Sequence, residues 1–193
     1  MNTVEHSLGL TDSGEKIVYV DNFAVTIKRK IGEGGFAYIY LVEDTRSGMD
    51  MVLKVMNLQT PGAVEVYERE AAVLMGVRHP HLLRACAVAR VGGGGGGGGR
   101  ALEQGRFLVE YCPGGHLLGT LQALGGVPMR EASVLGIFQQ VVAAVECLHT
   151  QDPPIAHWDL KPENILFYKD GHIKLCDFGS SVVGEVALGG GGG

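Results

Sequence analysis

The chain has 193 residues, enough for one domain or two closely joined lobes at a typical size of about 150 residues per domain. Hydrophobic residues make up 46% of it and charged residues 19%, a composition that excludes a disordered, highly charged protein. The formal net charge is −5, whereas general nucleic-acid binders are more often basic. We therefore expect a folded domain that binds no nucleic acid.

The ends and the cysteines indicate the compartment. The first 16 residues include acidic side chains and lack the apolar segment of a secretory signal, and no stretch approaches the ~18 uncharged apolar residues of a membrane span. The cysteines show neither CxxC pairs nor zinc-ligand spacing, so we expect reduced thiols. They are Cys86, Cys112, Cys147 and Cys176. These features predict a soluble cytoplasmic protein.

The first half of the chain has the pattern of an antiparallel sheet. Residues 1–22 predict a polar lead-in with one apolar patch, Ile17–Val20. Short β-rich runs follow from Phe23, over 38–42 and over 51–56, with tight turns between them. Over 63–77 the apolar spacing becomes helical, and His79-Pro80 closes this helix.

The second half adds helix to strand. Two more strands are predicted over 82–91 and 106–111, and the glycine tract 92–99 between them predicts a flexible loop tip. Residues 130–149 form the clearest amphipathic helix. Apolar runs at 165–168 and 173–176 flank an Asp-Gly turn, which predicts a hairpin. The order predicts an α+β fold.

Two features of the first half suggest phosphate chemistry. The cluster Gly32-Glu33-Gly34-Gly35-Phe36-Ala37 lies between two strands. A dinucleotide site would need a helix directly after it, so the alternatives are an ordinary turn or a flap whose backbone covers phosphates. Lys54 lies inside an apolar strand, where it either faces water or is held by Glu70 on the next helix. A held lysine could present its ammonium to phosphate oxygens.

The strongest signal is the polar loop His157–Asn164, followed after the hairpin by Asp177-Phe178-Gly179. Asp159, Asn164 and Asp177 are oxygen ligands or bases of the kind that magnesium–phosphate chemistry needs. Lys161, two residues from Asp159, could neutralise charge on a transferring group. A polar surface loop with chance carboxylates is the alternative.

Taken together, these segments resemble a eukaryotic protein kinase over about residues 24–183. GEGGFAYI at 32–39 resembles the Gly-rich loop, MVLK at 51–54 the lysine strand, LVEYCPGG at 108–115 the hinge, HWDLKPEN at 157–164 the catalytic loop and DFG at 177–179 the metal motif. The LKPEN sequence is similar to serine/threonine rather than tyrosine kinases. Glu33–Ala37 (EGGFA) together with KLCDFGS at 174–180 is similar to the Numb-associated kinases, the family of adaptor-associated and cyclin-G-associated kinases.

The resemblance implies a bilobal fold that binds ATP and Mg²⁺ and phosphorylates serine or threonine in protein substrates. The implied division is a lead-in at 1–22, an N-lobe at 23–111 with an antiparallel sheet and one regulatory helix, a partial, mainly helical C-lobe at 112–188 and a glycine tail at 189–193. Clathrin-adaptor-type partners follow from the subfamily by analogy alone.

The resemblance also implies residue roles. Lys54, held by Glu70, binds the α- and β-phosphates; Asp159 accepts or orients the substrate hydroxyl proton; Lys161 meets the γ-phosphate; Asn164 and Asp177 bind Mg²⁺. The residues implied to contact the nucleotide are Ile31, Gly32, Glu33, Gly34, Gly35, Phe36, Ala37, Ile39, Lys54, Glu110, Cys112, Asn164 and Asp177.

Three departures from the family pattern matter. Ala37 replaces the third loop glycine, as in the Numb-associated pattern. Trp158 replaces the arginine that normally pairs with a phosphorylated activation loop, and an indole cannot pair with phosphate. The chain stops 14 residues after Gly179, so we expect a C-terminally truncated domain with a bare apolar stripe on helix 130–149. The alternative function is a pseudokinase or a fragment that binds nucleotide or a partner without transfer.

Overall fold

The computed structural model describes residues 17–34, 37–92 and 103–184. The chain divides into two compact units. Of the described residues, one unit contains those up to 75 together with 84–92 and 103–111, and the other contains 76–83 and 112–184. Within the described residues, the first is built on an antiparallel sheet and the second contains two α-helices, a 3-10 helix and short strands, so the α+β prediction is confirmed.

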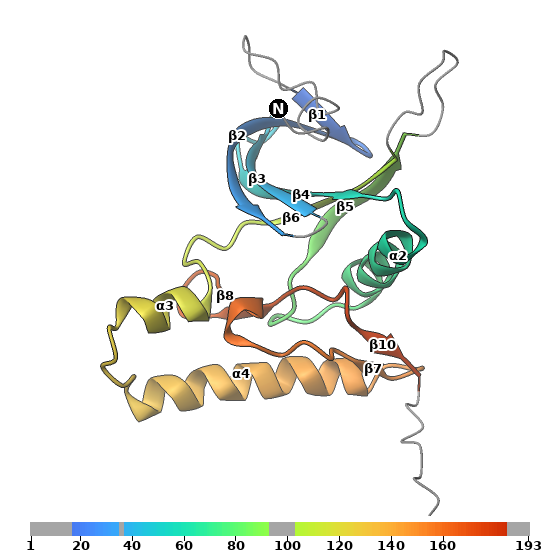
Figure 1. The fold of residues 1–193 in the computed structure, drawn as a ribbon. Coiled ribbons are helices and arrows are strands. Elements are labelled where there is room, and N and C mark those ends of the chain that lie inside the picture. The colour runs from blue at the N-terminus through green and yellow to red at the C-terminus, as the bar shows by residue number, and fades with distance from the viewer. Residues whose placement is uncertain (1–16, 35–36, 93–102, 185–193) are drawn as a thin grey trace, which may run out of the picture. The chain divides into compact units, whose positions relative to one another are not determined.

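The first unit is a six-stranded antiparallel sheet in the order β1-β2-β3-β4-β6-β5, with one helix, α2 (Figure 1). The sheet is curled, as the contacts of its edge strand β1 with β5 and β6 at the far side of the sheet show. Alternate strand residues therefore fill its concave face, with Val25, Tyr40, Leu53 and Leu108 among those that solvent does not reach. The elements are β1 Ile17–Val20, β2 Phe23–Glu33, β3 Ala37–Asp44, β4 Asp50–Asn57, α2 Pro61–Gly76, β5 Ala85–Val91 and β6 Gln104–Glu110.

The strand β1 was not predicted, since the sequence suggests only an apolar patch in a polar lead-in. Val18 pairs with Val25 of β2, and the side chains of Val18 and Val20 are buried in the core. The turn supplies the missed signal. Asp21 has a φ of 51°, and Asp-Asn is a two-residue sequence that tolerates the left-handed backbone of a tight hairpin.

Helix α2 agrees with the predicted helix 63–77 to within two residues at its start and one at its end. The hydroxyl of Thr60 accepts a hydrogen bond from the amide of Ala63, and Pro61 follows at the first helical position. The buried residues of α2 recur at helical spacing and so form one face. They are Ala63, Tyr67, Glu70, Val73 and Leu74.

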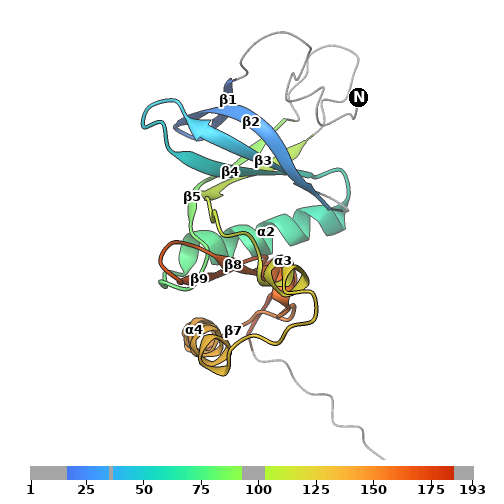
Figure 2. The ribbon, with the colours of Figure 1, turned by 90° about the vertical axis from the view of Figure 1, so that its left-hand side faces the viewer.

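The second unit contains the predicted long helix and the predicted hairpin, with β8 and β9 as a separate two-stranded sheet (Figure 2). The sequence did not predict α3, which is short and contains a glycine, nor the two-residue strands β7 and β10. The imidazole of His116 caps α3 by accepting from the amide of Gly119. The elements are α3 Leu117–Ala123, α4 Glu131–His149, β7 Ile155–Ala156, the 3-10 helix η1 Pro162–Asn164, β8 Ile165–Phe167, β9 Ile173–Leu175 and β10 Val182–Val183.

Part of the apolar stripe that the sequence predicts on α4 is exposed, namely Leu135, Phe138 and Val142 together with the neighbouring Val134, whereas Leu148 at the other end is buried. By length and composition, α4 is the one helix in the described ranges that could cross a membrane. A single helix of this kind is weak evidence of a membrane span. Helix α4 also contacts β7 and β9, and its Gln140 accepts a hydrogen bond from the amide of Ile173. These contacts attach α4 to its own unit.

Candidate active site

The glycine cluster forms the tip of the β2–β3 hairpin. The amide of Gly34 donates to the carbonyl of Ala37 over 2.9 Å, and the amide of Ala37 donates back over 3.3 Å. Glu33 pairs with Tyr38 just inside the loop. The strand–loop–strand setting that the sequence predicts is therefore present, although Gly35 and Phe36 lie outside the described residues.

Two of the loop glycines have no steric explanation within the fold. A Cβ at Gly34 would meet nothing within 4 Å, and one at Gly32 would lie 3.4 Å from Ile39 Cδ1, an ordinary contact. Neither has a positive φ, so backbone freedom does not require glycine at either position. The open space at Gly34 would let a ligand approach the backbone closely, and an ordinary turn is the alternative. The predicted neighbours Ile31 and Glu33 are exposed, and Ala37 and Ile39 are half-buried.

Lys54 and Glu70 form an ion pair that joins the sheet to the helix. The Lys54 Nζ atom lies 2.7 Å from each carboxylate oxygen of Glu70. Lys54 occupies β4, between Ile39 of β3 and Phe107 of β6 in the strand register. The interpretation of Lys54 as a strand residue facing water is therefore wrong, and the alternative with Glu70 is confirmed as a contact. The pair directs the lysine away from solvent and fixes its ammonium in position.

The two predicted hinge contacts lie in different units. Glu110 ends β6, and its carboxylate accepts from the amide of Arg84 over 2.9 Å. Cys112 has a buried side chain, and its carbonyl accepts from the amide of Gly115 over 3.3 Å. Since the Glu110 carboxylate already holds a hydrogen bond and the Cys112 side chain is buried, a role for these residues in nucleotide binding would be a role of the backbone. That role stays a prediction.

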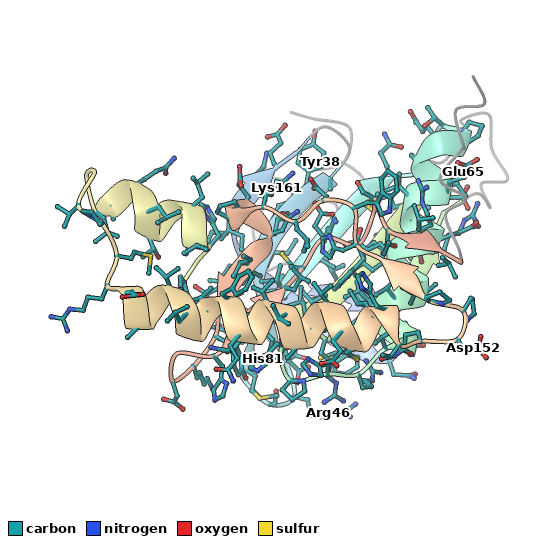
Figure 3. All side chains as sticks on the ribbon, turned by 90° about the horizontal axis from the view of Figure 1, so that it is seen from below. Tyr38, Arg46, Glu65, His81, Asp152 and Lys161 are labelled. Atoms are coloured by element: carbon teal, nitrogen blue, oxygen red, sulfur yellow. The ribbon has the colours of Figure 1, made fainter. Side chains whose placement is uncertain are left out.

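In the second unit, three residues of the polar loop 157–164 gather around one carboxylate. Lys161 Nζ lies 2.7 Å from Asp159 Oδ2, and Asn164 Nδ2 lies 3.0 Å from the same oxygen. Asn164 Nδ2 also donates to the backbone carbonyl of Asp159 over 2.8 Å. The hydrogen bond from Lys161 is the main reason that the pKa of Asp159 is lowered, and Asp159 in turn raises the pKa of Lys161. Asp159 is therefore ionised at neutral pH and poised to accept a hydrogen bond. Lys161, labelled in Figure 3, directly precedes η1.

His157 supports this loop from the interior. Its Nε2 atom lies 3.1 Å from the carbonyl oxygen of Cys176, and its Nδ1 atom accepts from the amide of Asp159 over 3.3 Å. One neutral tautomer, protonated at Nε2, satisfies both bonds. Burial is the main reason that the pKa of His157 is lowered, which favours this neutral form. The ring also meets the buried Phe178 edge-on at 5.2 Å. The sequence motif contained both residues, but their role in packing was missed.

The hairpin β8–β9 brings the two predicted metal ligands near each other. Ile165 pairs with Leu175, and the amide of Cys176 donates to the carbonyl of Asn164 over 3.0 Å. Asp177 is the next residue and has a φ of 65°, a left-handed conformation that aspartate tolerates.

This donor set fits Mg²⁺. Because the amide nitrogen of Asn164 donates to Asp159, its amide oxygen is the group suited to a cation, and Asp177 adds a carboxylate. The described part of the chain holds no group of three or more His, Cys, Asp or Glu side chains that could bind a metal alone. Mg²⁺ needs no such cage, since it is commonly held by one or two protein ligands together with phosphate oxygens.

Trp158 is the unusual residue of the loop. It has a φ of 61°, which is uncommon for a bulky side chain, and 64% of its surface is exposed. Its backbone conformation is thus one that the loop imposes at some cost. The substitution leaves an exposed indole where a charged side chain would otherwise stand, and nothing in the structure explains the choice of tryptophan.

Comparison with known proteins places these features in a family. The model of the protein kinase domain matches residues 25–186. A probable serine/threonine-protein kinase of Dictyostelium discoideum is 35% identical over 164 residues, which are 82% of this chain and 20% of that protein. The protein kinase domain-containing protein ppk38 of Schizosaccharomyces pombe is 33% identical, over 84% of this chain and 25% of that protein. The serine/threonine-protein kinase Nek1 of mouse is 33% identical, over 78% of this chain and 12% of that protein. The chain thus spans a quarter or less of the length of these relatives.

Proposed function

Because the chain belongs to the protein kinase domain family, with serine/threonine kinases as relatives, we propose that the protein transfers the γ-phosphoryl group of ATP to serine and threonine hydroxyls of protein substrates. One observation carries the proposal: an ionised Asp159 is held by both Lys161 and Asn164, within the loop that leads through β8–β9 to Asp177. This arrangement provides a proton acceptor, an exposed cation and metal ligands together.

Each residue has a chemical task in this reaction. Asp159 accepts the hydrogen bond of the substrate hydroxyl and takes its proton as the phosphoryl group is transferred. A lowered pKa makes Asp159 a weak base, which suits late proton transfer and orientation of the hydroxyl. Lys161 can exchange its contact with Asp159 for one with the transferring group, because its side chain is exposed. Positioning and charge neutralisation suffice, since a loose phosphoryl transition state asks for little covalent help.

The nucleotide and the metal are bound by the residues already described. Lys54, fixed by Glu70, would pair with phosphate oxygens, and the open space at Gly34 would let them approach the backbone. Asn164 and Asp177 would hold Mg²⁺, which when bound neutralises charge on the phosphate oxygens.

We propose a narrower placement among the Numb-associated kinases. It rests on the segments EGGFA at 33–37 and KLCDFGS at 174–180. Clathrin-adaptor-type protein partners and a cytoplasmic location belong to the same proposal. Phosphorylation of purified clathrin adaptors in preference to a generic basic protein would support it, and equal or slower phosphorylation would contradict it.

The test of phosphoryl transfer uses the whole chain with magnesium and γ-labelled ATP. We expect label on serine and threonine of a generic protein substrate, and a magnesium-dependent rise in melting temperature with ATP. Both should be lost or greatly reduced in Asp177→Asn. Asp170→Asn is a matched control, because Asp170 is exposed, also has a positive φ and lies in the β8–β9 turn. A melting transition that does not respond to ATP would contradict the proposal.

Trp158 supports the second candidate, a protein that binds nucleotide without transfer. A magnesium-dependent thermal shift with no label on any substrate would favour it. If transfer occurs, we expect the rate to stay unchanged after phosphatase treatment, because the indole at Trp158 cannot hold a phosphorylated loop. A lower rate after that treatment would show that a phosphate switch operates through other residues.

A further inference from the structure

Helix α2 is seated on the sheet by an aromatic ring three residues before Glu70. Tyr67 and Glu70 belong to the same buried face of α2. The Tyr67 ring packs on the ring of Phe107 in β6, with centroids 5.0 Å apart and planes tilted by 49°. This contact fixes the helix against the sheet directly beside the residue that must reach Lys54.

The seat for this ring is a glycine in the middle of a strand. Gly105 lies in β6, paired with Met56 of β4 and Arg90 of β5. A Cβ at Gly105 would lie 2.3 Å from Tyr67 Cδ2 and 2.5 Å from Cε2, so the ring would have to move. Its φ is not positive, so the strand conformation does not call for glycine. Glycine is unfavourable inside a strand, and the close approach of Tyr67 is the physical reason for it here.

The same contacts lead to the ion pair. Phe107 is the direct partner of Lys54 in the β4–β6 register, and the Lys54 ammonium lies 5.9 Å from the centre of its ring. Four residues are therefore connected in a ring of contacts. Tyr67 packs on Phe107, Phe107 lies beside the ammonium of Lys54, and Lys54 bonds the carboxylate of Glu70. Glu70 lies one helical turn after Tyr67 on α2, which closes this ring of contacts.

We propose that Tyr67, seated over Gly105, is a positioning residue that sets the rotation and height of α2 so that Glu70 holds Lys54. The role deepens the proposed function, on which it rests for its effect on ATP. The ring performs it and the hydroxyl does not, since the contacts that define the seat are ring contacts. Burial also raises the pKa of the Tyr67 hydroxyl, which keeps the phenol neutral.

The first experiment measures the ion pair without ATP. The ¹H–¹⁵N signal of a hydrogen-bonded lysine ammonium is visible because its hydrogen exchange is slow, and the Lys54 signal is assigned by its loss in Lys54→Arg. We expect Gly105→Ala to speed this exchange and Tyr67→Phe to leave it unchanged. Gly62→Ala is the matched control, because it adds a methyl to α2 where a Cβ meets nothing within 4 Å. An unchanged Lys54 signal in a folded Gly105→Ala protein would overturn the proposal.

The second experiment asks whether the effect passes through Lys54. We expect Gly105→Ala to weaken magnesium–ATP binding by roughly tenfold to a hundredfold, as misplacement of a binding group does. Gly105→Ala with Tyr67→Leu should bind ATP more tightly than Gly105→Ala alone, because the clash is removed. In a Lys54→Met background neither change should weaken binding further. Additive losses in that background would mean a general packing defect and would overturn the proposal.

Two further results can be told apart from a failure of the proposal: a Gly105→Ala variant that does not fold, and an unaltered chain that binds no ATP. If Gly105→Ala does not fold, Tyr67→Leu alone carries the test, because it removes the ring without a clash and should speed exchange at Lys54. If the unaltered chain binds no ATP, the proposed function fails, while the ammonium measurement still decides whether Tyr67 positions the pair.

Discussion

Two lysine–carboxylate pairs with the same separation differ in almost every other respect. Lys54–Glu70 and Lys161–Asp159 each have a nitrogen–oxygen distance of 2.7 Å. In the first pair the side chains are 20% and 5% exposed and come from a strand and a helix 16 residues apart. In the second they are 44% and 31% exposed and lie two residues apart in one loop.

The difference indicates what each pair can do. Separating a nearly buried ion pair is costly, because it leaves an unpaired charge with little access to water. Such a pair therefore stays formed. It is therefore suited to hold a lysine still. An exposed pair gains little from its contact and can exchange partners at low cost. It is suited to release a lysine toward a substrate when one arrives. Removing the carboxylate of each pair in turn tests this contrast.

The largest expected effect is on catalysis at the exposed pair. Asp159→Asn should lower the rate of phosphoryl transfer by roughly 10²–10⁴-fold, the usual contribution of a positioned base. The melting temperature should stay close to that of the unaltered protein, because the pair is exposed and Asn164 can still bond the backbone carbonyl at this position. Rates from labelled ATP and a melting curve on the same sample test both parts. A large fall in melting temperature would show that the loop depends on the pair for its stability.

The buried pair should behave in the opposite way. Glu70→Gln leaves Lys54 without its counter-charge and should lower the free energy of unfolding by about 2–4 kcal/mol. We place it at the lower end for buried pairs because Lys54 retains some contact with water. Glu68→Gln is the control. Glu68 lies on the same helix, but it is exposed and its ion pair with Arg90 is longer, at 3.6 Å. Urea denaturation of both variants measures the difference. Equal stabilities would mean that the buried pair contributes no more than the surface pair.

A third measurement uses pH to test how much His157, the buried first residue of the loop 157–164, contributes to stability. Burial lowers the pKa of His157 in the folded protein, so the folded state binds its proton less readily than the unfolded state. Its contribution to stability is complete above the unfolded pKa of about 6.5 and is lost as pH falls through the folded pKa. His79 acts in the same direction, because burial together with His81 and Lys174 lowers its pKa.

We therefore expect the melting temperature to fall between about pH 7 and pH 5, with a shallower fall in His157→Asn. His149→Asn serves as a control, since His149 is exposed at the end of α4. Asp159 does not contribute in this window, because its lowered pKa places its loss of charge at more acidic pH. A steeper fall in His157→Asn than in the unaltered chain would contradict this account.

The sequence predicted those parts of the fold and site that local pattern determines. The helix α4 and the β8–β9 hairpin follow from periodicity and an Asp-Gly turn. The Lys54–Glu70 contact was one of two alternatives for a lysine isolated among apolar residues, and the family resemblance favoured it. The strand β1 was missed because four residues carry little pattern, and it is held by its pairing with β2 and its contacts with β5 and β6. The seat of Tyr67 over Gly105 could not be predicted, because the two residues meet through the folded sheet and nothing in either segment indicates the other.

The smallest expected effect on stability is at Gly34, where the fold has room for a side chain but a bound phosphate would leave none. Gly34→Ala should leave the melting temperature unchanged, since its Cβ meets nothing within 4 Å and its φ is not positive. It should nevertheless weaken ATP binding, because a methyl group on the backbone keeps phosphate oxygens at a distance. Gly48→Ala is the opposite case, in the β3–β4 turn: its Cβ is equally unobstructed, but its φ of +69° makes alanine strained by about 1 kcal/mol. Gly48→Ala should therefore lower the melting temperature and leave ATP binding unchanged. If both variants lost stability and neither lost ATP affinity, the glycine loop would be an ordinary turn, and the fixed ammonium of Lys54 would be left as the first unit's contribution to phosphate binding.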